Sequence, residues 1–189
     1  MAGAGIDAPL RRAGVEPRQQ PRICDDGDAF GFARGQCHAF EAKQSKATDP
    51  GYVRIDSQLM VAFDGIPVLE KPTGALAGPS RVFELRTYES HNKAAHRKKT
   101  EMFNKGEIDI FRRRGLRPVL FGSNIIGTRL PSLTYLLVFE DMAAREKNWP
   151  QFVSHPDWKT LVATPGYSDA EIVSNRHSFI LRPTSYSQI

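Results

Sequence analysis

The stretch VFELRTYE at residues 82–89 decides the fold of this protein. Side chains of a β-strand point alternately to its two faces, and this stretch can alternate over its whole length. The face with Phe83 and Leu85 is expected to lie under helices because both side chains are apolar. The opposite face is then exposed or covered by a partner sheet, and it carries Glu84, Arg86 and Tyr88.

The elements that follow residues 82–89 have a regular order. Residues 93–114 have the apolar spacing of a helix, which Gly115 ends, and residues 142–149 form a second helix, which Pro150 breaks or kinks. A short helix begins near Ser154, and further strands are expected at residues 119–126, 133–140 and 171–181. The order strand, helix, strand, strand, helix, strand is that of a ferredoxin-like α+β domain.

The chain divides into four parts. Residues 1–46 have no apolar period and are expected to be a disordered or non-native tail. Residues 47–70 include a predicted strand at 52–63, and their corner ATDPGY is similar to ATPGY at 163–167. We therefore interpret them as the remnant of a first copy of the domain. Residues 71–80 are a linker by composition and mark a domain boundary, and residues 81–185 are the domain itself.

Composition excludes several classes of protein. The 189 residues are 40% hydrophobic and 25% charged, which is typical of a globular protein. No run approaches the roughly 20 apolar residues that span a bilayer. Cys24 and Cys37 are too few for a disulfide scaffold or a closed zinc site. No apolar region follows Arg11 and Arg12, so we expect no secretory signal and a cytoplasmic protein. The net charge of +5 permits an anionic ligand without requiring one.

The sequence FELRTYE at residues 83–89 resembles the opening strand of the NIPSNAP family. The resemblance continues through the helix end at Gly115, the strand at 133–140, the Arg145…Trp149 spacing and the motif Pro156-Asp157-Trp158, and it covers about residues 81–185. It implies a dimeric α/β barrel, in which two ferredoxin-like sheets pack face to face, and therefore a homodimer. It implies no particular activity.

The strand face that lines the interior of such a barrel supplies the candidate ligand-binding residues. Glu84, Arg86 and Tyr88 are suited to line a small cavity, in which the arginine would bind an anionic group; a hydrophobic ligand stays open. The alternative is an internal Glu84–Arg86 network that only satisfies the dimer interface. His177 on the last strand is the fourth candidate, because the resemblance allows one histidine to be an axial haem ligand.

No metal site and no cofactor are expected. The histidines after the tail form no His-x-x-His or His-Glu-x-x-His set; they are His91, His96, His155 and His177.

Two further functional classes stay open. One is a monooxygenase-like enzyme of the same superfamily, with Arg86, Tyr88 and His177 in its pocket. The other is a binder of nucleic acid or of an acidic partner through the basic clusters at residues 97–99 and 112–114. Nucleic acid is not the expected partner, because aromatic residues are not interleaved with these charges as base stacking requires.

Self-association follows from the same topology. A sheet with both helices on one side leaves its other face open. Whichever residues of the strands at 119–126 and 133–140 face outward, several large apolar side chains lie on that face. Because a contiguous apolar patch usually marks an interface, we expect a second copy of the chain to cover it.

Overall fold

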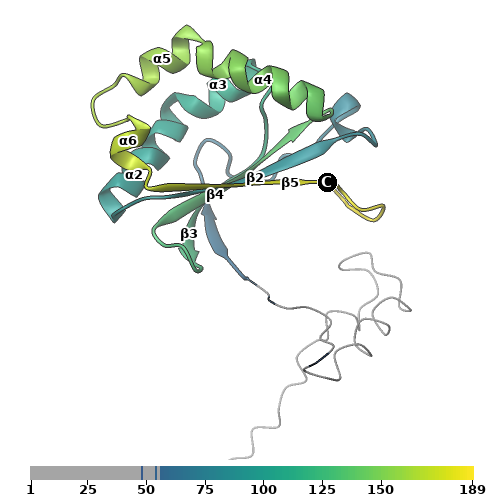
Figure 1. Ribbon diagram of the computed structural model, residues 1–189, viewed down its shortest axis with the longest axis horizontal. Coiled ribbons are helices and arrows are strands. Elements are labelled where there is room, and N and C mark those ends of the chain that lie inside the picture. Colours follow the sequence, from purple (N-terminus) through teal and green to yellow (C-terminus); the bar gives the residue numbers. More distant parts are fainter. Residues whose placement is uncertain (1–47, 49–53, 55) are drawn as a thin grey trace, which may run out of the picture. The chain divides into compact units, whose positions relative to one another are not determined.

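The α-helices lie on one side of an antiparallel β-sheet in the computed structural model (Figure 1). The structure describes residues 48, 54 and 56–189. The predicted tail at 1–46 lies outside the described residues, and so does the corner at 47–52 apart from Thr48. Residues 54–189 belong to one compact unit, and it is this unit that carries the described elements.

The ferredoxin-like order predicted from the sequence is confirmed. In chain order the elements are β2 (Val82–Glu89), α2 (Lys93–Met102), the π-helical segment η2 (Phe103–Glu107), α3 (Ile108–Arg113), β3 (Arg117–Ile126), β4 (Ser132–Phe139), α4 (Met142–Ser154), α5 (Pro156–Val162), α6 (Asp169–Ile172) and β5 (Asn175–Leu181). These strands lie in the order β3-β4-β2-β5, and every neighbouring pair is antiparallel.

A fifth strand, β1 (Leu59–Ala62), extends the sheet beyond β3, to which it is antiparallel. It is shorter than the strand predicted at 52–63. Gly122 of β3 allows the close approach, since a Cβ there would lie 2.9 Å from Met60 Cβ. The linker at 71–80, which contains the 3-10 helix η1 (Gly74–Ala77), therefore connects two parts of one sheet. The interpretation of residues 47–70 as the remnant of a first copy stays a prediction.

Two element boundaries differ from the predictions. Pro150 does not break the second helix, because α4 continues to Ser154. The carbonyl of Glu146, which loses its partner at Pro150, lies at an exposed position where water can reach it, while Phe152 anchors the next turn in the core. The last strand begins at Asn175 rather than at residue 171, because the residues before it form α6.

The predicted orientation of β2 is wrong. Its helix-facing side carries Val82, Glu84, Arg86 and Tyr88, and the side with Phe83 and Leu85 is the one that no α-helix covers in the described part of the chain (Figure 1). The partner strand decides this orientation. The helix-facing residues of β2 are in register with the bulky side chains of β4, which are Phe139, Leu137, Tyr135 and Leu133.

Aromatic rings fill the space between the sheet and the helices. Phe121 of β3 stacks on Tyr135 of β4 with ring centroids 4.7 Å apart, and Phe103 of η2 contacts both rings. Phe111 of α3 packs edge-on against Phe152 of α4 at 4.7 Å. These contacts fix both helical segments on the sheet.

The helices in the described part of the chain are too short or too polar to cross a membrane.

Candidate functional site

Ionisable side chains are buried between the sheet and the helices. We call this set the charged layer, and it consists of Glu84, Arg86, Tyr88, Lys99, Glu107 and Tyr135. Glu84, Lys99 and Tyr135 are fully buried, and Glu107 is 2% exposed. Burying a charge is costly unless it is paired, so the partners of each group decide what the layer can do.

Glu84 is held from four sides by protein groups. Arg145 of α4 donates two hydrogen bonds to its carboxylate, at 2.8 and 3.0 Å, and Trp149 Nε1 donates a third at 2.7 Å. Ser178 of β5 donates a fourth at 2.7 Å, and Arg86 is 3.3 Å away. Burial would raise the pKa of Glu84, but these hydrogen bonds outweigh it and hold the pKa below its usual value. The carboxylate is thus saturated and joins α4 to the sheet.

Arg86 is enclosed by aromatic rings. Its guanidinium lies 4.4 Å from the ring centroid of Trp149 and 5.4 Å from that of Tyr88. Its Nε is buried and makes no hydrogen bond among the described residues. The stacking on Trp149 stabilises the part of the guanidinium that makes no hydrogen bond.

Lys99 lies in a cage of two carboxylates and three rings. Its Nζ is 2.9 Å from Glu107 Oε2 and 3.2 Å from Asp169 Oδ1. The rings of Phe103, Tyr88 and Trp158 surround it, with centroids at 4.8, 5.6 and 5.6 Å. Burial would lower the pKa of Lys99, but the negative charges of Glu107 and Asp169 outweigh it and raise the pKa, so the lysine stays charged.

The π-helical segment η2 brings Lys99 and Glu107 together. In a regular α-helix, residues eight positions apart are about 80° apart around the axis. The wider π turn rotates each residue by less, so it reduces this offset and turns Glu107 toward Lys99. The ion pair and the π turn therefore belong to one local structure.

Tyr88 and Tyr135 form a buried pair beside this cage. The hydroxyl of Tyr135 donates to that of Tyr88 at 2.9 Å, and the rings meet edge to face. Burial raises the pKa of both phenols, that of Tyr135 most strongly. Both hydroxyls are therefore protonated at neutral pH.

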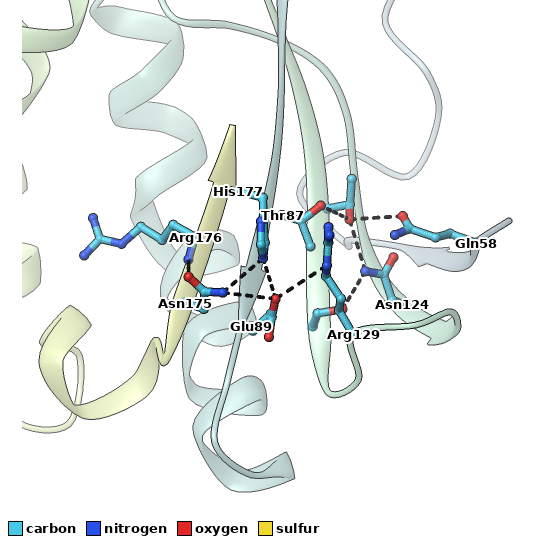
Figure 2. A network of polar contacts seen from close by, with 10 residues as sticks. Gln58, Thr87, Glu89, Asn124, Arg129, Asn175, Arg176 and His177 are labelled. Atoms are coloured by element: carbon cyan, nitrogen blue, oxygen red, sulfur yellow. Dashed lines mark hydrogen bonds and ion pairs between the residues drawn. The ribbon is translucent and has the colours of Figure 1, made fainter. Parts of the chain in front are cut away.

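The opposite side of the sheet, which we call the open face, carries a separate polar network (Figure 2). His177 Nε2 lies 2.6 Å from Glu89 Oε1, and Asn175 Nδ2 lies 3.1 Å from the same histidine nitrogen. Further along, the hydroxyls of Thr87 and Thr134 are 3.0 Å apart. Asn124 Nδ2 donates to Thr134 at 3.0 Å and to Ser132 at 2.7 Å. Its Oδ1 is buried and makes no hydrogen bond among the described residues.

The open face is divided into an apolar half and a polar half. In β2, Phe83 and Leu85 are followed by Thr87 and Glu89, and the register places the same change at the same level in the neighbouring strands. The apolar half includes Leu120, Leu136, Val138, Phe179 and Leu181; the polar half includes Asn124, Ser132, Thr134, Asn175 and His177. Leu76 and Ile189 pack on the apolar half, but Phe179 and Leu181 remain 53% and 42% exposed.

The structure does not bring the four predicted site residues together. Glu84, Arg86 and Tyr88 are neighbours in the charged layer, whereas His177 lies across the sheet on the open face. His177 Nε2 is already engaged by Glu89 and Asn175, so the nitrogen that would bind a haem iron is not free. The described residues contain no group of three acidic, histidine or cysteine side chains that could hold a metal ion.

Sequence reasoning missed several residues of both sets. Lys99 lies next to the apolar positions of its helix and is fully buried. One signal was present: a lysine among the apolar positions of a helix often has a buried acidic partner. No sequence signal singled out Asn124 or Thr134, since their meeting depends on the pairing of β3 with β4.

Comparisons with known proteins agree with this architecture. A NIPSNAP-like domain protein from Burkholderia xenovorans is 21% identical, with a TM-score of 0.52 over 59% of this chain and 92% of that one. A NIPSNAP family protein from Agrobacterium tumefaciens is 16% identical, with a TM-score of 0.51 over 58% and 94% of the two chains. These likenesses show the fold. No curated protein matches the sequence. The family model NIPSNAP matches residues 83–188, which are more than half of the chain, and the protein therefore belongs to the NIPSNAP family.

Proposed function

We propose that this NIPSNAP protein is a homodimer that binds a small polar ligand between its two open faces. The observation that carries the proposal is the division of the open face into an apolar and a polar half. A two-fold pairing that places the apolar halves against each other leaves the polar halves facing across a common space. The dimer is then a binding protein rather than an enzyme.

The apolar half supplies the association energy. Phe179 and Leu181 are exposed, and they lie beside a buried apolar cluster that includes Phe83 and Val138. Large apolar side chains contribute most of the free energy of an interface when they become fully buried at its centre. A second copy of the chain has the same apolar surface, so pairing the two copies buries the exposed apolar side chains of both.

The polar half supplies the ligand contacts. Asn124 Oδ1 lacks a donor among the described residues but is buried, so the acceptors within reach of a ligand are those of the Glu89–His177 pair, whose side chains are each about one quarter exposed. A ligand with hydroxyl or amino groups could donate to these acceptors. Of the four predicted site residues, His177 is therefore the one we assign to the ligand. Glu84 has no such role here, because it is fully buried on the helical side of the sheet, away from the open face.

Dimer formation is tested by placing a charge in the apolar half. Phe179→Asp is expected to convert a dimer into a monomer at micromolar concentration, because it buries an unpaired carboxylate in the interface. Sedimentation equilibrium measures the change. Val153→Asp on α4 is the matched control, since Val153 is 54% exposed on the helical side, and it should leave the dimer intact. A wild-type chain that sediments as a monomer would overturn the proposal.

Ligand binding is tested by native mass spectrometry of the purified dimer. We expect the wild-type dimer to carry an additional small mass, and His177→Phe to lose it while remaining a dimer, because the substitution removes the polar ring nitrogens. His91→Phe is the control, since His91 is exposed in the loop before α2. A dimer without any retained mass, or a mass that His177→Phe retains, would contradict the ligand assignment but not the dimer.

A further inference from the structure

A cleft of about 700 Å³ lies at one end of the sheet, away from the charged layer. Its walls are the segment at 70–76, the first residues of β3 and the second turn of α4. Four cationic side chains line it, and they come from these three walls and from α3: Lys71, Arg112, Arg117 and Lys147. The volume falls within the range of small-molecule sites in proteins.

Three of the four cations have no ion-pair partner among the described residues. Lys71, Arg117 and Lys147 are exposed, and none of them forms an ion pair with another residue in the described part of the chain. Arg112 is bound to Glu70 at 2.6 Å, and the lining includes one further carboxylate, that of Glu140. The lining thus has an excess of positive charge, and clefts of one sign concentrate ions of the other.

The walls of the cleft are held in place before any ligand binds. The backbone N–H of Glu70 donates to the carbonyl of Val119 at 2.9 Å, which fixes the segment at 70–76 against β3. Asn148 Nδ2 donates to the carbonyl of Gly115 at 3.1 Å, which fixes α4 against the end of α3. Gly115 has φ +76°, and a Cβ there would lie 2.6 Å from Asn148 Nδ2, so this corner requires glycine. A preformed site loses less conformational entropy on binding.

The arginines at 112–114 and Arg117 have different surroundings in the structure. Arg113 is paired with Asp157 of α5 at 3.0 Å and Arg112 with Glu70, so the charges of these two arginines already have acidic partners. Arg117 instead lines the cleft, together with Lys147 and Lys71 from other elements. A cleft of this size, with three cations that have no ion-pair partner among the described residues, suits a compact polyanion better than an extended nucleic acid.

We propose that this cleft binds a small molecule through its phosphate groups, held by Arg117, Lys147 and Lys71. Arg117 can donate two parallel hydrogen bonds to phosphate oxygens, and the lysines neutralise the remaining charge. The site is separate from the proposed ligand space on the open face and does not rest on it.

Isothermal titration of the full chain with inorganic pyrophosphate tests the site. We expect saturable binding with one pyrophosphate per chain. The double variant Arg117→Gln/Lys147→Gln should weaken this binding by about tenfold or more, because it removes two cations that contact the phosphate groups and so makes the binding free energy less favourable. Lys93→Gln/Arg97→Gln is the matched control, because it removes the same charge from exposed positions on α2. The control should bind within about twofold of the wild type.

A second arm distinguishes the source of the phosphate. Co-sedimentation with phosphatidylcholine vesicles, with and without phosphatidic acid, measures binding to a lipid headgroup. If pyrophosphate or phosphatidic acid binds, and only the cleft variant loses that binding, the site is supported and the probe that binds identifies the source of the phosphate. If neither probe binds, or if both double variants weaken binding equally, the charge is diffuse and the proposal is overturned. Because the cleft shares Leu76 and Val138 with the apolar half of the open face, sedimentation of each variant must show the same oligomeric state before their binding is compared.

Discussion

Replacing Lys99 by methionine is expected to lower the free energy of unfolding by about 3–5 kcal/mol, because it leaves a buried carboxylate without its cation. Glu107 is 2% exposed, and Lys99 is the group that neutralises it at 2.9 Å. Asp169 is less affected, since Arg176 also contacts it at 3.3 Å. Urea unfolding at one fixed protein concentration measures the change as a lower midpoint.

The double variant Lys99→Met/Glu107→Leu separates the lost pair from a general loss of packing. Replacing both charges by apolar side chains of similar size is expected to recover most of the stability, since no unpaired charge remains. Lys105→Met is the exposed control: Lys105 pairs with Glu101 at the surface, so its loss should leave the midpoint nearly unchanged. A single variant as stable as the wild type would show that Glu107 finds another partner.

Glu84→Gln is expected to cost about 3 kcal/mol, because the amide keeps the shape of the carboxylate but removes its charge and one of its two acceptor oxygens. Arg145, Trp149 and Ser178 all donate to this carboxylate, and the NH₂ group of a glutamine would face at least one of these donors. The loss should appear in urea unfolding. Glu146→Gln, at an exposed position of α4, is the control and should be neutral.

The same variant predicts a change in acid stability. The pKa of Glu84 is lower in the folded chain than in the unfolded chain, so the group stabilises the fold above its ordinary pKa of about 4.3. This contribution is lost as the pH falls through the lowered folded-state pKa. The stability of the wild type should therefore decline more steeply below about pH 4.3 than that of Glu84→Gln. Parallel declines would show that Glu84 has an ordinary pKa.

The order of the elements could be predicted from the sequence because its signals are local. The alternation at 82–89, the apolar spacing at 93–114 and the stop at Gly115 each depend on neighbours a few residues away. The end of α4 is the exception: Pro150 is an unfavourable helix residue, but the helix continues to Ser154, where Phe152 packs in the core.

The orientation of β2 could not be predicted in this way. Each of its faces carries two apolar or aromatic side chains, so hydrophobicity does not distinguish them. Glu84 and Arg86 lie under the helices only because α4 and β5 provide Arg145, Trp149 and Ser178 as partners. The sequence of one strand does not reveal which side chains of other elements will pair with its polar residues. The prediction that Glu84, Arg86 and Tyr88 lie on the open face is therefore wrong, and the sequence does not decide the face of His177.

The sequence by itself determined the fold class, the family and the presence of an uncovered sheet face. Only the tertiary structure decided which residues occupy each face, and thus that the open face is half apolar and half polar. Thr87, Thr134 and His177 are up to ninety residues apart in sequence, and they meet because antiparallel register aligns their strands at one level. Register depends on the packing of all strands at once, so no single segment encodes it.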